Sequence, residues 1–342
     1  PSTPTRPLDM KAFVIHRYGK NEVGQIADMP EPALRDDDVL VQIHAASVNV
    51  LDIRIRSGAL KPILRYRLPL ILGNDMAGTV VRVGPRVRRF QPGDAVYARP
   101  DQERIGTFAQ FIAVREDDVA PKPRNLSMAQ AASIPLVGLT AWQALVEIAQ
   151  LKAGQKVFIH AGSGGVGTIA IQLARHLGAH VAATTSTANV DAVKALGADV
   201  VIDYKQQAFE TVLRDYDVVL HSLSKDELEK SLQVLKPGGR LISISGPPTA
   251  DMADQLRLSW PIRQVLRLLS HGIRTKARQR GIRYAFLFMT ANGGQLRDIT
   301  ALIEAGAIKP VVDRVFPLDA AADALAYVAT GRAKGKVVIT VP

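Results

Sequence analysis

The 342-residue chain contains no cysteine. Disulfides, thiolate nucleophiles and cysteine-ligated zinc all need that side chain, so each of them is excluded. Aromatic residues make up only 5% of the sequence, which leaves few platforms for stacking nucleic-acid bases. No apolar run approaches the roughly 20 residues of a membrane span, and the first residues do not resemble a secretory signal. We therefore expect a soluble, cytoplasmic protein.

The net charge of +11 allows nucleic acid or an anionic membrane as a partner. However, the basic residues are dispersed over most of the chain. We therefore favour a polyanionic cofactor as the reason for the charge, with neither nucleic acid nor membrane as a partner. A length of 342 residues predicts about two domains, each able to bury a core.

One segment carries most of the functional signal. A predicted strand, Lys156–His160, leads into a glycine-rich turn, and a helix with apolar periodicity follows. Glycines at such a turn let the backbone approach a pyrophosphate, and the helix N-terminus presents N–H groups to it. The order strand, turn, helix favours a dinucleotide site over an ordinary tight turn. We expect the cofactor to contact Gly162, Ser163, Gly164, Gly165, Val166 and Gly167.

The chain divides into three parts by pattern. Residues 1–130 read as short strands punctuated by Gly and Pro, which predicts an all-β, barrel-like module. Residues 131–290 alternate strands and helices, which predicts a doubly wound parallel sheet of α/β class. Residues 291–342 are too short for a core of their own, and we expect them to complete the first module. The predicted sheet strands are Lys156–His160, His180–Thr184, Asp199–Ile202, Asp217–His221 and Arg240–Ser245.

Several short motifs together resemble the medium-chain dehydrogenase/reductase superfamily. The similarity covers essentially Met10 to Val341 and is strongest to the zinc-independent branch of quinone oxidoreductases and alkenal (enone) reductases. It implies a GroES-like β-barrel catalytic domain, formed by residues 1–130 and 291–342, and a Rossmann cofactor domain. The motifs are Ala46–Asp52, Gly73–Gly78, Gly138–Ala141, Ala161–Gly167, Leu196–Asp199, Ile202–Tyr204 and Gly335–Val338.

The resemblance also indicates why metal is not expected. Zinc-dependent relatives carry a cysteine where this chain has Asn49 and a histidine where it has Asn74. Amides are poor zinc ligands beside thiolate and imidazole. The histidines have no metal-binding spacing. His160 and His221 end predicted strands, and for both we favour a packed or surface histidine over a ligand-binding one.

The end of the second sheet strand predicts the cofactor. NAD-binding sheets usually place Asp or Glu there, and that carboxylate repels a 2′-phosphate. Here the chain has Ser186 and Asn189, which predicts NADPH. Asn189 replaces a lysine of several quinone oxidoreductases, which weakens the charge argument without reversing it. The resemblance adds further cofactor contacts at Thr140, Tyr204, Ser245, Phe288, Met289 and Lys336.

The implied reaction is hydride transfer to a quinone or an α,β-unsaturated carbonyl. Asn49 is the expected hydrogen-bond donor near the nicotinamide or substrate, Thr140 contacts the cofactor, and Asp52 orients the turn after Asn49. A pocket with Leu60, Tyr66 and Leu136 suits a small hydrophobic substrate. Relatives with two pocket tyrosines differ from this chain, so the proton donor stays open between Tyr66 and water. Two alternatives remain: a cofactor-binding structural or regulatory protein, and an RNA-binding relative with little turnover.

Two later segments bear on partners. Met252–Arg283 is basic and amphipathic, and we favour a helix whose apolar positions form a buried stripe over binding to membrane or nucleic acid. Tyr284–Met289 reads as an edge strand. In the resembled family that strand pairs across a dimer, so we expect a homodimer.

Overall fold

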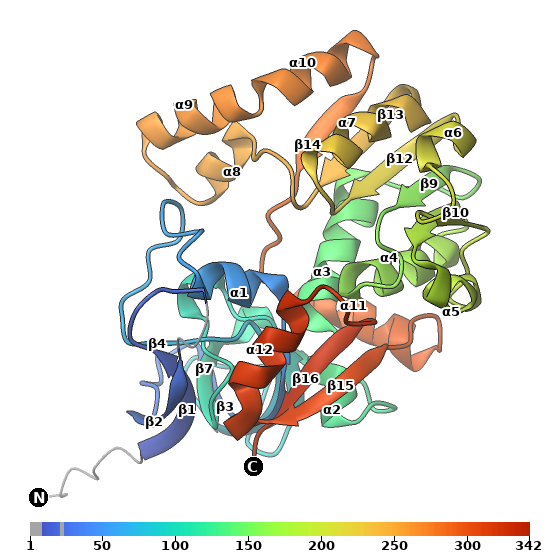
Figure 1. Ribbon diagram of the computed structural model, residues 1–342. Coiled ribbons are helices and arrows are strands. Elements are labelled where there is room, and N and C mark those ends of the chain that lie inside the picture. Colours follow the sequence, from blue (N-terminus) through green and yellow to red (C-terminus); the bar gives the residue numbers. More distant parts are fainter. Residues whose placement is uncertain (1–8, 21–23) are drawn as a thin grey trace, which may run out of the picture. The chain divides into compact units, whose positions relative to one another are not determined.

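The computed structural model describes residues 9–20 and 24–342, which form two compact units (Figure 1). The first unit contains the described residues up to Leu139, together with Thr290–Gly306 and Pro310–Pro342. The second contains Thr140–Met289 and Ala307–Lys309. The chain passes from one to the other within α3 (Pro135–Trp142).

The first unit is built on β-sheets. In its described part, one sheet has the order β15-β16-β3-β5-β6-β8 with β7 paired to β3, and a smaller one has the order β2-β1-β4. Phe13, Ile43 and Ile339 belong to one apolar core, so the C-terminal strand shares the core of the N-terminal ones. The strands are β1 (Asp9–Ile15), β2 (Gln25–Pro30), β3 (Asp38–Val48), β4 (Leu70–Ile71), β5 (Asp75–Val83), β6 (Ala95–Ala98), β7 (Phe111–Arg115), β8 (Val119–Pro121), β15 (Val312–Pro317) and β16 (Lys336–Thr340).

The C-terminal residues are part of the first unit through both hydrogen bonds and packing. Strand β16 pairs antiparallel with β3, with Val337 opposite Val48. Helix α11 packs against β8, and the Tyr97 hydroxyl donates to the Leu296 carbonyl at 2.8 Å. The helical segments of this unit are α1 (Val50–Arg56), α2 (Met128–Ala132), α11 (Gly293–Glu304) and α12 (Ala321–Ala329), with short turns η1 (Gln102–Arg104), η2 (Glu116–Asp118) and η5 (Leu318–Ala320).

The second unit is a parallel sheet with the strand order β11-β10-β9-β12-β13-β14. The order reverses between β9 and β12, which is where doubly wound sheets bind ligands at the carboxyl ends of their strands. The expected α/β class and Rossmann architecture are confirmed. The strands are β9 (Lys156–Ile159), β10 (His180–Thr185), β11 (Val200–Asp203), β12 (Tyr216–His221), β13 (Leu235–Ser243) and β14 (Arg283–Phe286).

Helices and turns connect these strands. Helix α4 is buried at every residue from Gly167 to Ala174, which is about two full turns, so this part is covered on all sides. The segments are η3 (Gln143–Ile148), α4 (Gly165–His176), η4 (Thr187–Asn189), α5 (Val190–Ala195), α6 (Phe209–Val212), α7 (Lys225–Val234), α8 (Ala250–Gln255), α9 (Trp260–Leu269) and α10 (His271–Gln279). No described helix is long and apolar enough to cross a bilayer.

Two sequence predictions in this unit need correction. The strand predicted at Tyr284–Met289 lies at the sheet edge as β14 but ends at Phe286. The buried stripe predicted for the basic segment holds for Leu266 and Ile273 and is wrong for Trp260 and Leu269, which are 70% and 58% exposed. The reason is that α9 packs mainly against α8 and α10 rather than against the sheet, so only part of its apolar surface is covered.

Replacing Gly293 with Ala tests the attachment of α11 to β8. A Cβ at Gly293 would lie 2.3 Å from the Val119 carbonyl oxygen, whereas at the next residue, Gly294, the nearest atom is the Asn292 Oδ1 at 3.1 Å. Both changes fall in the first helical turn. Gly293→Ala should lower the free energy of unfolding by roughly 1–3 kcal/mol relative to Gly294→Ala. Equal midpoints of urea unfolding for the two variants would contradict this packing.

Candidate cofactor and active site

The glycines of the turn after β9 differ in how closely other parts of the protein approach them. A Cβ on Gly167 would lie 2.2 Å from the Ala161 carbonyl oxygen, and one on Gly162 would lie 2.9 Å from the Ala183 Cβ. These two glycines therefore allow close approach of helix, turn and strand. At Gly164 a Cβ would lie 3.3 Å from the Ala161 carbonyl oxygen, which is a tight contact but a less severe one than at the other two glycines. The backbone at Gly164 can approach a ligand.

The start of α4 completes a phosphate-binding arrangement. The helix begins at Gly165, and its N-cap, Gly164, supplies no side-chain cap. The first N–H groups of a helix and its dipole both favour an anion. Gly162 to Gly167 thus fit the pyrophosphate of a dinucleotide.

Ser163, Ser186 and Asn189 come together beside this turn, at the carboxyl end of β10. The Thr185 hydroxyl donates to Ser163 Oγ at 3.0 Å. Asn189 Nδ2 donates to Ser186 Oγ at 3.1 Å and lies 3.4 Å from Ser163 Oγ. This cluster is neutral and consists of hydroxyl and amide groups.

The neighbouring strand β11 adds two groups at the same edge of the sheet. Asp203 lies opposite Thr185, but its carboxylate accepts from its own chain, at Lys205 N (3.0 Å). Tyr204 follows β11 and is 60% exposed, with its N–H donating to the Thr185 carbonyl. The Tyr204 side chain is therefore free to contact a ligand beside the neutral cluster.

Buried histidines and serines fix the ends of β12 and β13. His221 Nε2 donates to the Ser224 carbonyl at 3.0 Å, so its Nδ1 accepts from Ser243 Oγ at 2.9 Å. Burial lowers the pKa of His221 to about 4, which keeps the ring neutral. The Ser245 hydroxyl donates to the Leu223 carbonyl. His160 is buried as well, and both histidines are packed residues, as predicted.

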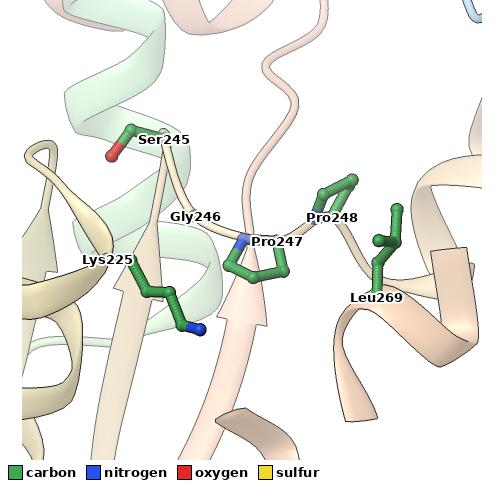
Figure 2. A pocket seen from close by; sticks show the side chains of 6 residues that line it. All are labelled: Lys225, Ser245, Gly246, Pro247, Pro248 and Leu269. Carbon is green, nitrogen blue, oxygen red and sulfur yellow. The ribbon is translucent and has the colours of Figure 1, made fainter. Parts of the chain in front are cut away.

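Ser245 also lines a pocket of the second unit (Figure 2). The predicted cofactor contacts Phe288 and Met289 follow β14, where the Phe288 carbonyl accepts from Gln255 Nε2 at 2.9 Å and the Met289 side chain is buried. Thr140 is buried in α3. The pocket residues are Lys225, Ser245, Gly246, Pro247, Pro248 and Leu269.

The first unit contains a buried charged network centred on Lys336. Its ammonium donates to Asn49 Oδ1 and to the Val48 carbonyl (3.1 Å), and lies 3.5 Å from Asp75 Oδ2. Asn49 Nδ2 donates to Asp75 Oδ2 at 2.9 Å, and the Ser47 hydroxyl donates to the same oxygen at 2.7 Å. The pairing of β16 with β3 places Lys336 here. The predicted cofactor contact of Lys336 stays a prediction.

The amide of Asn49 is oriented by this network. Because Oδ1 faces the ammonium, Nδ2 faces Asp75 and directs its second N–H toward the Ser47 carbonyl, 3.4 Å away. A contact of that length is weak. One N–H of Asn49 therefore has only a weak intramolecular partner.

A second carboxylate, Asp52, supports the turn after Asn49. Asp52 Oδ2 accepts from Asn49 N, and Oδ1 accepts from Asn74 Nδ2, both at 2.7 Å. The bond from Asn49 N to Asp52 is part of a capping box at the start of α1, so Asp52 orients the turn after Asn49 as expected. Burial raises the pKa of Asp52 to about 6. Burial also lowers the pKa of Lys336, against the opposing effect of Asp75 and Asp52.

The other predicted pocket residues lie on the same unit. The backbone N–H of Leu136 donates to Asp75 Oδ1 at 2.8 Å, so Asn49 and Leu136 share one carboxylate. Leu60 packs against the apolar core. The Tyr66 hydroxyl donates to the Gln102 carbonyl at 2.7 Å, and burial raises the Tyr66 pKa. No hydrogen bond described here joins Tyr66 or Leu60 to Asn49.

Sequence reasoning missed two charged residues. The carboxylate of Asp75 contacts Asn49, Leu136 and Lys336. The sequence shows Asp75 only as part of the Gly73–Gly78 motif. Its place beside Asn74, in an apolar strand, was the available signal. Arg99 is buried at the end of β6, donating to the Pro100 carbonyl. Nothing in the local sequence distinguishes Arg99 from an exposed arginine, because its burial depends on tertiary packing.

The described residues contain no cluster of three His, Cys, Asp or Glu side chains that could hold a metal. At the two positions where zinc-dependent relatives carry ligands, the amides of Asn49 and Asn74 are hydrogen-bonded to Asp75 and Asp52.

Comparison with known proteins defines the class. A family model for the alcohol dehydrogenase GroES-like domain matches residues 35–124, and one for zinc-binding dehydrogenases matches residues 196–339. The quinone oxidoreductase structure from Coxiella burnetii has a TM-score of 0.86 and 31% identity, covering 98% of this chain and 100% of that one. The chain belongs to the medium-chain dehydrogenase/reductase superfamily, among its quinone and alkenal oxidoreductases.

Two curated relatives refine this assignment. The bovine mitochondrial NAD(P)H oxidoreductase RTN4IP1 is 36% identical over 99% of this chain and 91% of its own length. The Arabidopsis thaliana chloroplastic NADPH-dependent alkenal/one oxidoreductase is 34% identical over 97% of this chain and 80% of its own. The protein is an oxidoreductase with a nicotinamide cofactor, and the resemblance seen in the sequence is confirmed.

Replacing Asp52 with Asn tests the buried network through pH. The folded-state pKa of about 6 exceeds the unfolded value of 3.8, so the folded protein binds more protons between these values. The wild type should lose on the order of 2–3 kcal/mol of unfolding free energy as pH rises from 4 to 7 through this group. Asp52→Asn stays neutral and lacks that loss. Asn74 Oδ1 has no hydrogen-bond partner among the described residues. If the amide of Asn74 rotates, this oxygen can accept from the new amide at position 52 in the Asp52→Asn variant.

The measurement is urea unfolding of both proteins at several pH values from 4 to 7. The difference between their unfolding free energies should change in favour of Asp52→Asn as pH rises. A difference that is the same at every pH would show that Asp52 is ionised in the folded protein throughout this range.

Proposed function

We propose that the protein is an NADPH-dependent reductase that transfers hydride to an α,β-unsaturated carbonyl or a quinone without zinc. The proposal is supported most directly by the neutral cluster of Ser163, Ser186 and Asn189 beside the glycine turn. A carboxylate at this place would bind the ribose hydroxyls of NAD and repel a 2′-phosphate. Hydroxyl and amide groups would donate hydrogen bonds to the phosphate oxygens, and the name of the Arabidopsis relative agrees with NADPH.

In the proposed reaction the cofactor and the protein have different roles. NADPH, when bound, would supply the hydride for the β-carbon of an enone or for a quinone. Negative charge then develops on the carbonyl oxygen and needs a hydrogen-bond donor. We assign this role to the weakly engaged N–H of Asn49, which Lys336 and Asp75 orient. The Tyr66 hydroxyl donates to the Gln102 carbonyl, which favours water over Tyr66 as the proton donor.

A small hydrophobic acceptor would find a mostly apolar environment beside Leu60, Leu136 and Tyr66. The cofactor would contact Thr140, Tyr204, Ser245, Phe288 and Met289. The homodimer expected from the family is likewise proposed, with β14 as the pairing edge. Its test is the molar mass of the protein in solution.

Replacing Ser186 with Asp tests the cofactor assignment. The wild type should turn over a panel of enones and quinones faster with NADPH than with NADH, and chelators should leave the rates unchanged. Ser186→Asp should weaken NADPH binding by roughly 1–3 kcal/mol through repulsion of the 2′-phosphate, with little effect on NADH. Ser186→Asn, which has the same size without the charge, is the control.

Kinetics and fluorescence titration of both cofactors measure these effects. Equal preference of the wild type for NADPH and NADH would disprove the cofactor proposal. Tight NADPH binding without turnover of any acceptor would instead favour a cofactor-binding structural or regulatory protein.

A further inference from the structure

Helix α9 exposes an apolar surface that the fold of the second unit does not cover. Leu266 is buried, whereas Trp260, Val265, Leu268 and Leu269 are 70%, 53%, 75% and 58% exposed. At about 100° per residue, Leu268 lies nearly opposite Leu266, and the exposed apolar residues cover about half of the helix circumference, from Trp260 through Leu268 and Val265 to Leu269. Exposed aromatic and leucine side chains grouped on one helix are unusual for a surface that meets only water.

Although basic residues occur along most of the chain, this segment carries most of the net positive charge, because acidic residues balance the basic ones elsewhere. Between Gln255 and Arg283 the sequence contains no Asp or Glu. Of the basic residues in this segment, only Arg263 and Lys276 form ion pairs among the described residues, with Asp254 and Glu229. The basic residues of the segment are Arg257, Arg263, Arg267, Arg274, Lys276, Arg278, Arg280 and Arg283, which is eight positive charges in a chain whose net charge is +11.

Apolar and basic residues occupy neighbouring positions along two consecutive helices. Figure 1 shows α9 and α10 following one another along the periphery of the second unit. On α9 the exposed Arg267 adjoins the apolar side, and on α10 Lys276 and Arg278 are exposed. An apolar helix face bordered by Arg and Lys is the pattern of helices that lie in the interface of an anionic membrane.

We propose that α9 and α10 dock the protein on the surface of an anionic lipid bilayer, with Trp260, Leu268 and Leu269 entering the interface. The charge argues for this occupant: a second copy of the chain would bring the same positive segment against itself. An RNA would bind the arginines but leave the apolar face of α9 in water. Helix α9 has ten residues, so it lies on the bilayer and does not span it.

The docking face is continuous with the pocket at the carboxyl ends of the sheet strands. Leu269 ends α9 and also lines the pocket that contains Ser245 and Lys225 (Figure 2). A protein docked in this way has the pocket mouth near the lipid. If the proposed reductase function holds, the consequence is access to acceptors that are dissolved in the membrane, such as quinones with apolar tails.

Fluorescence of Trp260 tests the docking without any measurement of turnover. The chain has two tryptophans, so Trp142→Phe leaves Trp260 as the single reporter. Vesicles of phosphatidylcholine with about one third phosphatidylglycerol should shift its emission to shorter wavelength, and brominated lipids should quench it. Vesicles of phosphatidylcholine alone should do so much less. The absence of a shift with both kinds of vesicle would overturn the proposal.

Matched variants of the full-length protein separate the two contributions in a vesicle sedimentation assay. Leu268→Glu should reduce the bound fraction at least tenfold, whereas Val315→Glu, at an exposed valine of the first unit, should not. Arg278→Gln with Arg280→Gln should weaken binding several-fold and reduce its salt dependence. Lys152→Gln with Lys194→Gln removes the same charge elsewhere and should have little effect. Circular dichroism confirms that each variant is folded.

Other occupants give different results. A lipid-independent blue shift that grows with protein concentration, together with a dimer abolished by Leu268→Glu, would identify α9 as a contact between copies. Binding of RNA that survives Leu268→Glu, without vesicle binding, would identify a nucleic-acid surface. Either result contradicts membrane docking, and neither depends on the proposed reductase activity.

Discussion

The buried contact of the Lys336 ammonium with Asn49 and Asp75 is the interaction on which the first unit and its chemistry depend. An ammonium and a carboxylate removed from water cost several kcal/mol each unless they are paired and hydrogen-bonded. Here the carbonyl of Val48, the amide of Asn49 and the carboxylate of Asp75 compensate the charge of Lys336. Loss of one partner would weaken this compensation, while the other two would remain.

This contact joins the C-terminal strand to the N-terminal part of the first unit. Lys336 begins β16 and Asn49 follows β3, and these strands are neighbours in one sheet. The C-terminal segment therefore supplies both a strand of the first unit and the cation that orients Asn49. In the zinc-independent reaction proposed above, the ammonium of Lys336 would hold the neutral amide of Asn49 in place. An amide donor suits a conjugated acceptor, whose negative charge is delocalised as it forms.

Much of the fold followed from the sequence because its signals are local. The turn from Ala161 to Gly167 and the alternation of strands and helices identified the parallel sheet, and the strand order confirms it. The grouping of Ser163, Ser186 and Asn189 also followed, since turn and strand end meet at one sheet edge.

What the sequence did not reveal depends on contacts between distant residues. Asp75 lies 26 residues from Asn49 and 261 from Lys336, so only the folded sheet shows that one carboxylate binds both. Burial of Arg99 is likewise a result of tertiary packing. For Trp260 and Leu269 helical periodicity gave the right helix, but periodicity alone does not say which apolar residues a neighbour covers.

The most direct test of this account is the rate of enone reduction by Asn49→Ala with saturating NADPH. Ser47→Ala is the matched control, because both side chains donate to Asp75 Oδ2. If Asn49 donates to the developing oxyanion, its loss should lower turnover about 10²–10³-fold, with NADPH affinity nearly unchanged. Ser47→Ala should remain close to the wild type. Wild-type turnover by Asn49→Ala on every acceptor would show that Asn49 has only a structural role and would contradict the account.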